Sequence, residues 1–263
     1  MANFDINNFI IDRAIRGTMV SHKTGEIMYS INQVEDPQLT VSADEKTAVD
    51  AMGTTIATFN TAKNAEFSGS NSMFDLNLLA SQMGTTKKVA GSESKIVSPI
   101  FETIDVTGKT VTIKNEPVGK KLEAIYVLNS DSTLGKKYTS DATESADKFK
   151  YENESKTITL PTSVTTGQIF VMYEAELDNA VEVEASATEF PTGGKFILEV
   201  LGCDVCDQTT LRYAYIIFPN AKLDSNFDIS FTTDGKHPFS LKANQAYCDK
   251  KKTLFKIVIP ELA

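Results

Sequence analysis

The sequence predicts a mainly β protein: a β-sandwich or partial barrel with one covering α-helix, and a second, small β-sandwich inserted into it. The first observation is the stretch 196–231, in which apolar runs alternate with turn residues, as in paired strands. The second is a series of short strand-like segments between 103 and 184, at the spacing of a small sandwich module. The third is a lone amphipathic segment, Ser72–Met83, that suits a helix covering a sheet.

The stretch 196–231 is expected to hold the larger domain together. Tyr213–Phe218 is apolar throughout, which is typical of a strand buried on both faces. Pro219 and Asn220 are expected to end this strand, because proline has no N–H to donate to a neighbouring strand. The alternation of apolar and polar residues over Phe227–Phe231 predicts a further strand with one buried face.

The N-terminal region is expected to add strands to the same domain. The segment Phe4–Ile11 is rich in apolar residues, so we expect it to dock on its own fold or on a neighbouring subunit. The turn composition of Lys23–Gly25 and the alternation over Glu26–Val34 predict a hairpin that ends in a strand.

Residues 42–68 leave more than one interpretation open. Ser42–Gly53 begins with capping-box spacing but continues with poor helix formers, so a short helix, a strand and a loop all remain possible. Thr54–Asn60 and Asn64–Ser68 are interpreted as two strands joined at Thr61–Lys63. In this hairpin apolar and polar residues are mixed, which is typical of a sheet with one packed and one wet face.

The predicted helix spans Ser72–Met83. Ser72 can cap its N-terminus, with Asp75 three residues on, and Gly84 stands where a left-handed C-terminal cap belongs. An apolar stripe is expected to face the sheet; it consists of Phe74, Leu78, Leu79 and Met83.

The chain is predicted to consist of a domain at 1–100 and 185–263, interrupted by an insert at 101–184. Around 90–100 the composition shifts to Gly, Ser, Glu and Lys, which predicts a linker. The segment 130–146 is polar and is expected to form an exposed, mobile loop. Within the insert, strands are predicted at Thr110–Lys114, Leu122–Leu128, Lys148–Tyr151, Thr157–Leu160 and Gln168–Glu176. In the larger domain, a closing strand is predicted at Leu254–Ile259.

Composition narrows the functional classes. The 263 residues are 41% apolar and 23% charged, enough for a packed core. The formal net charge of −9 argues against a nucleic-acid binder, which would carry a basic surface. No window approaches the roughly 20 apolar residues of a membrane helix, so no membrane insertion is expected. The polar start MANFDINNF and an odd number of cysteines, three, favour a cytoplasmic protein.

No motif predicts an enzyme or a bound cofactor. Cys203 and Cys206, with Cys248 downstream and His237 nearby, have the spacing of half a zinc site, but a second ligand pair is missing. We therefore expect these thiols to act as small apolar residues and no metal to be bound. Neither His237 nor His22 lies near a recognisable nucleophile motif.

Several segments carry a resemblance to a known family. They are Asp12–Gly17, Ala65–Leu76, Phe218–Leu223 and Asn226–Ile229. These segments resemble the major tail proteins, or tail tube proteins, of long-tailed bacteriophages that infect Gram-positive hosts. In the middle of the chain, Lys148–Tyr151 and Val171–Tyr173 are similar to immunoglobulin-like inserts of such virion proteins.

The resemblance implies a tube domain whose β-sandwich closes part of a ring, usually of six subunits, with an immunoglobulin-like insert. Rings would stack into a hollow tail tube, assembled in the bacterial host cytoplasm together with other phage tail proteins. DNA would pass through this homo-oligomeric virion component without specific binding, and an acidic protein suits such a conduit because it repels phosphates. The alternative is a capsid decoration or accessory protein, or a module of the virion that binds the host surface.

We hypothesise that the hairpin near 54–68 lines the lumen and pairs with the next subunit. The residues assigned to assembly and to the lumen are Thr58, Phe59, Asn64 and Glu66. Glu66 would supply one of the carboxylates that keep DNA mobile, and pairing between subunits would satisfy edge strands that otherwise promote uncontrolled association.

Overall fold

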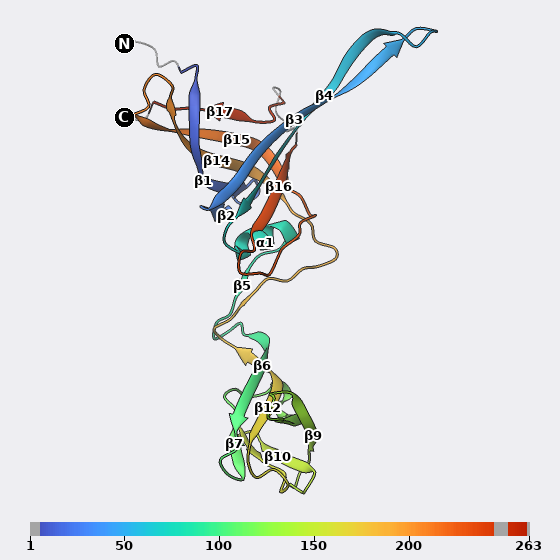
Figure 1. Cartoon of the computed structure of the whole chain (residues 1–263), viewed down its shortest axis with the longest axis vertical. Helices are drawn as coiled ribbons and strands as arrows, with labels where there is room; N and C mark the ends of the chain where they lie inside the picture. Colours follow the sequence, from blue (N-terminus) through green and yellow to red (C-terminus); the bar gives the residue numbers. More distant parts are fainter. Residues whose placement is uncertain (1–5, 245–251, 262–263) are drawn as a thin grey trace. The chain divides into compact units, whose positions relative to one another are not determined.

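The computed structural model describes residues 6–244 and 252–261 (Figure 1). The chain forms two compact units, Met1–Lys87 with Val183–Ala263, and Lys88–Glu182. These unit boundaries differ from the sequence-based ones. In particular, the predicted linker around 90–100 is wrong in its second half, because strand β6 (Ile96–Asp105) begins there and belongs wholly to the second unit.

The fold is mainly β, as predicted. The first unit contains one sheet with the strand order β2-β1-β14-β15-β16-β4-β3, and β17 pairs with β15. Its elements are β1 (Phe9–Ser21), β2 (Ile27–Ile31), β3 (Val34–Val49), β4 (Thr55–Asn71), α1 (Leu76–Met83), β14 (Gly193–Asp204), β15 (Leu211–Leu223), β16 (His237–Ala243) and β17 (Lys256–Val258). The β1–β2 hairpin and the closing strand β17 confirm two of the sequence-based predictions.

Four phenylalanine rings form the centre of this unit. Phe67 on β4 lies with its ring centroid 5.5 Å from Phe196 on β14, although β15 and β16 separate these two strands in the sheet. In a flat sheet the strands would be roughly 14 Å apart, because neighbouring strands are about 4.8 Å apart. The sheet therefore curls into a partial barrel, and Phe218 and Phe239 complete the cluster at 6.2 and 6.0 Å from Phe67.

Helix α1 begins later than predicted. Asp75, not Ser72, is the N-cap residue: its backbone is extended, and its carboxylate accepts a 2.7 Å hydrogen bond from the Leu78 N–H. The predicted C-cap is confirmed, since Gly84 adopts the left-handed conformation with φ 77°. Leu78 and Leu79 are buried, whereas Phe74 lies before the helix and is half exposed.

The structure of β15 and of the segment after it corrects three predictions. One face is buried through Ala214 and Phe218, but Tyr213 on the other face is exposed, so the strand is not buried on both faces. It also continues through Pro219. That residue lies between the segments that pair with β17 and with β16, and opposite an irregularity in β14, so its missing N–H interrupts no regular ladder. Finally, Phe227–Phe231 contains no strand.

Strands β3 and β4 settle the interpretation of residues 42–68. Ser42–Val49 is part of β3, so the strand alternative holds. Apart from Thr54, the predicted strand segments Thr54–Asn60 and Asn64–Ser68 both lie in β4, but the predicted turn at Thr61–Lys63 is wrong, because β4 runs unbroken over 17 residues. Its hairpin partner is β3, and the turn lies at Asp50–Thr54.

The second unit is a curled sheet with the order β6-β12-β8-β9-β10-β11-β7. Its two ends face each other across one core, because Val111 and Ile158 cluster with Ile125, Ile169 and Val171. All five predicted strands are present; the predicted loop 130–146 is wrong, since it contains β9, whose Tyr138 reaches the core. The remaining elements are β5 (Lys88–Val89), β7 (Thr110–Thr112), η1 (Val118–Lys120), β8 (Ala124–Leu128), β9 (Leu134–Ser140), β10 (Lys148–Glu152), β11 (Thr157–Thr159), β12 (Gln168–Leu177) and β13 (Val181–Glu182).

Candidate assembly surface

The β3–β4 ribbon extends beyond the sheet of the first unit as a two-stranded arm (Figure 1). We define the arm as residues 41–64, because β16 pairs with β4 only from Glu66 onward. Large apolar side chains of the arm face solvent, among them Ile56 and Phe59 at 69% and 61% exposure. An isolated two-stranded ribbon is marginally stable in water, so such an arm gains stability from a partner surface.

The tip of the arm is fixed by Asp50. Its carboxylate accepts hydrogen bonds from the backbone N–H groups of Thr54 at 2.8 Å and Met52 at 2.9 Å. These bonds hold the pKa of the Asp50 carboxyl below its usual range. Gly53 has φ 84°, a conformation that glycine adopts without steric cost. The turn is therefore specified by local chemistry rather than by burial.

A β-bulge divides the arm into two parts with different faces. Ala43 pairs with Lys63, but Glu45 pairs with Asn60, so two residues of β4 lie opposite one residue of β3. Since pairing alternates between the two faces, the bulge reverses which β4 residues share a face. Beyond it, Phe59 and Ala57 make one face apolar, while Thr58 and Asn60 lie on the other.

The bulge decides where the four predicted site residues lie. Asn64 and Glu66 are on the same face at the base of the arm, Phe59 continues that face beyond the bulge, and Thr58 lies on the opposite face. The four residues assigned to assembly and to the lumen therefore occupy both faces of the ribbon.

Glu66 and Asn64 line a surface pocket of about 380 Å³ at the arm's base. Lys242 of β16 pairs with Glu66 in register and lines the same pocket. Its ammonium group bridges to Asp224 at 3.1 Å, and Asp224 first and then Glu66 raise the pKa of Lys242. Glu66 is thus a carboxylate with a cation beside it.

The outer face of the curled sheet, opposite the phenylalanine cluster, has two chemically different halves. Across β3, β4 and β16 it carries mainly uncharged polar side chains, namely Gln38, Thr40, Ser42, Asn64, Ser68, Ser70 and Ser240. Across β1, β14, β15 and β17 it carries mainly apolar ones, namely Ile10, Ile197, Leu211, Tyr213, Tyr215, Ile217 and Val258. Sequence analysis did not identify this apolar half as a surface. The run Tyr213–Phe218, which is apolar on both faces of the strand, was the signal that could have revealed it.

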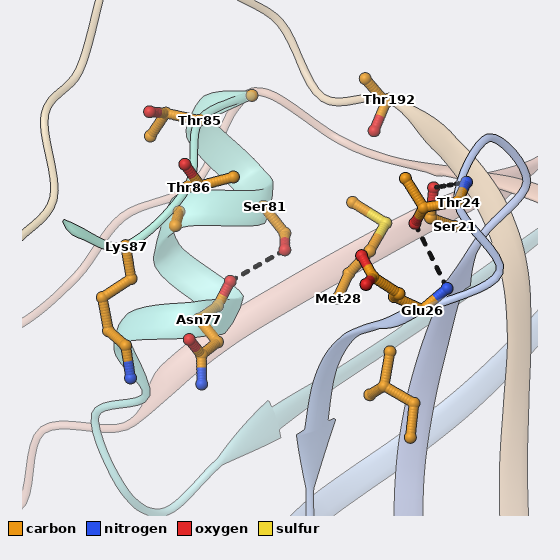
Figure 2. A pocket seen from close by; sticks show the side chains of 13 residues that line it. Ser21, Thr24, Glu26, Met28, Asn77, Ser81, Thr85, Thr86, Lys87 and Thr192 are labelled. Atoms are coloured by element: carbon orange, nitrogen blue, oxygen red, sulfur yellow. Dashed lines mark hydrogen bonds between the residues drawn. The ribbon is translucent and has the colours of Figure 1, made fainter. Parts of the chain in front are cut away.

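A surface pocket of about 400 Å³ lies between α1 and the β1–β2 turn (Figure 2). Its hydroxyl groups serve local structure. Ser21 Oγ accepts hydrogen bonds from the Lys23 and Thr24 N–H groups, and Ser81 Oγ donates to the Asn77 carbonyl oxygen at 2.8 Å. Neither a histidine nor a cysteine is among its lining residues, and its ionisable side chains are Glu26 and Lys87.

The residues with the spacing of half a zinc site lie on β14, in the turn after it and on β16. Cys203 lies on β14 and Cys206 in the following turn, both as free thiols, and Cys248 lies outside the described residues. No group of three or more His, Cys, Asp or Glu side chains is placed to hold a metal within 6–244 and 252–261.

His237 is instead part of a buried network between β16 and α1. Its Nδ1 accepts from the Asp75 N–H at 3.3 Å, so its Nε2 donates to Gln82 Oε1 at 2.8 Å. The Phe74 ring stacks on the imidazole, with 5.3 Å between centroids. Burial lowers the pKa of His237, which stabilises the neutral ring that this hydrogen-bonding pattern requires.

A comparison with known families decides the relationship of the chain. Residues 9–256 match the YomU/Tube protein family, which covers both units. The chain belongs to the YomU/Tube protein family. Membership in this tube family identifies the chain as a tube-like structural component of a bacteriophage tail. No match is found among curated proteins.

Two observations accompany the membership in the tube family. The arm and the outer face of the sheet expose large apolar side chains, among them Ile56, Phe59 and Leu211. No helix in the described part of the chain is long and apolar enough to cross a membrane.

Proposed function

We propose that this protein assembles with itself into rings, and that the rings stack into the tail tube through which phage DNA is delivered. The observation that carries the proposal is the arm 41–64, whose apolar side chains find no cover in the described residues of their own chain. Six subunits per ring follow from the resemblance to tail tube proteins. Assembly takes place in the host cytoplasm with other tail proteins, and the role is structural rather than enzymatic and uses no cofactor.

The lumen is proposed to be lined by the polar half of the sheet's outer face. Asn64 and Glu66 lie there among hydroxyl and amide side chains, which interact weakly with phosphates. The chain's net charge of −9 adds general repulsion of DNA, so DNA slides without specific binding. Phe59 and Thr58, beyond the bulge, are assigned to the contact between subunits.

The second unit is proposed to be an immunoglobulin-like insert. Its support is the curled, mostly antiparallel sheet whose ends face one apolar core, although β9 and β10 pair in parallel. A second function, binding of the host surface, is favoured by one observation on this unit. Phe101 and Phe170 stack 6.1 Å apart on its outer face, and Phe101 is exposed.

Proline substitution in the arm tests the proposed assembly. Thr58→Pro removes a backbone donor within the arm, so a folded chain that no longer assembles is expected. Ala51→Pro is the matched control, because Ala51 is the second residue of the turn closed by the Gly53 N–H and the Asp50 carbonyl, where proline is favoured. Sedimentation velocity and circular dichroism report assembly and folding. Normal assembly by the Thr58 variant would show that the arm is not the seam.

A further inference from the structure

The apolar half of the sheet's outer face is left exposed by the described residues of the first unit. We call it the β1–β17 face and define it by the outward residues of β1, β14, β15 and β17. Leu211 and Tyr213 on it are 57% and 41% exposed. Ile10 and Val258 are also exposed, and Ile197, Tyr215 and Ile217 are half buried. Monomeric proteins rarely leave such a surface open, so it marks a contact with another chain.

The polar groups on this face are mainly cationic. Arg13, Arg16, Lys195 and Lys256 lie at its outward positions. Glu199 bridges to Arg16 at 3.0 Å, and Asp12 lies beside Arg13 at 3.4 Å. The four cations are accompanied by these two carboxylates, so the charged positions of the face carry a net positive charge.

The arm has the complementary character. Its residues 41–64 include three carboxylates and two lysines, a net negative charge. The apolar side chains Phe59 and Ala57 share one face of the ribbon, and Ile56 and Met52 continue toward the tip. Lys46 pairs with Phe59 on this apolar face, so the arm's carboxylates exceed its lysines by only one. The match to the β1–β17 face therefore rests on apolar side chains, with a small excess of opposite charge.

We propose that the arm of one copy of this chain lies across the β1–β17 face of the next copy. The inference deepens the proposed function, on which it rests, by naming the two surfaces that meet. The contact is heterologous: every copy gives one arm and offers one face, so copies join head to tail into a ring or a filament rather than a closed dimer.

Mixing two defective variants tests this directionality. An arm variant, Ile56→Thr with Phe59→Thr, and a face variant, Leu211→Thr with Tyr213→Thr, are each expected to remain folded monomers, because all four side chains are exposed. In an equimolar mixture the intact arm of the face variant meets the intact face of the arm variant. Sedimentation velocity should then show one new species with twice the monomer mass, which stops there.

The controls separate this inference from the proposed function. A mixture of the arm variant with a chain that carries all four substitutions should remain monomeric. If the unmodified chain assembles and the face variant assembles equally well, the arm docks elsewhere, while the tube function stands. If the unmodified chain forms neither rings nor tubes, the tube function itself fails.

A charge variant covers the case in which the face variant misfolds. Arg13→Glu changes a side chain that is 66% exposed, so the fold should persist. It should weaken assembly at low salt, and the difference from the unmodified chain should shrink as salt screens the charges. Unchanged assembly at low salt would contradict the proposed contact.

Discussion

Phe67 and Phe59 lie on the same strand, β4, and allow one prediction with an internal control. Phe67 is 1% exposed, and its ring contacts those of Phe196, Phe218 and Phe239. Phe67→Ala removes the ring that joins β4 to the rest of the curled sheet. Loss of a buried phenylalanine costs about 3–5 kcal/mol of the free energy of unfolding. In a domain of 150–250 residues this lowers the melting temperature by about 6–20 °C.

Phe59→Ala removes the same side chain from the exposed arm. We expect it to change the free energy of unfolding by no more than about 0.5 kcal/mol, because surface substitutions of this kind are close to neutral. It should instead weaken assembly directly, whereas Phe67→Ala should weaken assembly only by destabilising the fold.

Calorimetry combined with amide hydrogen exchange measures both variants. The Phe67 variant should lose protection across β4, β14, β15 and β16, while the second unit, which has its own core, keeps its protection. The reasoning would be refuted by equal melting temperatures for the two variants, because β4 would then not depend on the phenylalanine cluster.

Three further predictions concern single sites. Burial holds the pKa of His237 below its unfolded value of about 6.5, so the unfolded state binds more protons in the window between the two values, and stability is lost as the pH falls through that window, by up to about 1.4 kcal/mol per pH unit. Urea unfolding should therefore give a lower free energy of unfolding at pH 5.5 than at pH 7.5, and a His237→Asn variant that keeps the same pH dependence would contradict this. Gly84→Ala should lower the free energy of unfolding by at least about 1–2 kcal/mol, because φ is 77° and the new Cβ would overlap the backbone of Phe190. Thermal melting measures this loss, and an unchanged melting temperature would be inconsistent with the left-handed cap. Glu66→Lys should permit assembly, but in a filter-binding assay the tubes should retain DNA at low salt, and retention should fall as the salt concentration rises. If retention does not depend on salt, the assignment of Glu66 to the lumen wall is contradicted.

Strand content and the helix end were accessible to sequence reasoning because they depend on local patterns. Alternation predicts the β1–β2 hairpin and all five strands named in the insert, and Gly84 predicts its own left-handed cap. The pattern fails where pairing partners override local composition. Residues 61–63 look like a turn, yet β3 pairs with β4 on both sides of them and keeps the strand continuous.

The face that each candidate site residue occupies could not be predicted from the sequence, because a single extra residue reverses the faces of a strand. Nothing in the composition of residues 60–63 reveals the bulge, which leaves Thr58 and Glu66 on opposite faces. The apolar run Tyr213–Phe218 was interpreted as burial on both sides within one chain. Only the structure shows that Tyr213, on the second face, is exposed among the described residues. The run therefore marks a surface that can contact another chain as well as part of the core.

Electron microscopy of the purified full-length chain tests the central claim most directly. We expect hollow rings or stacked tubes for the unmodified protein. The Thr58→Pro variant should give only single particles of monomer size at the same concentration. Discrete small particles for the unmodified protein, at every concentration at which it remains dissolved, would contradict the assignment of this chain as a self-assembling tail tube subunit.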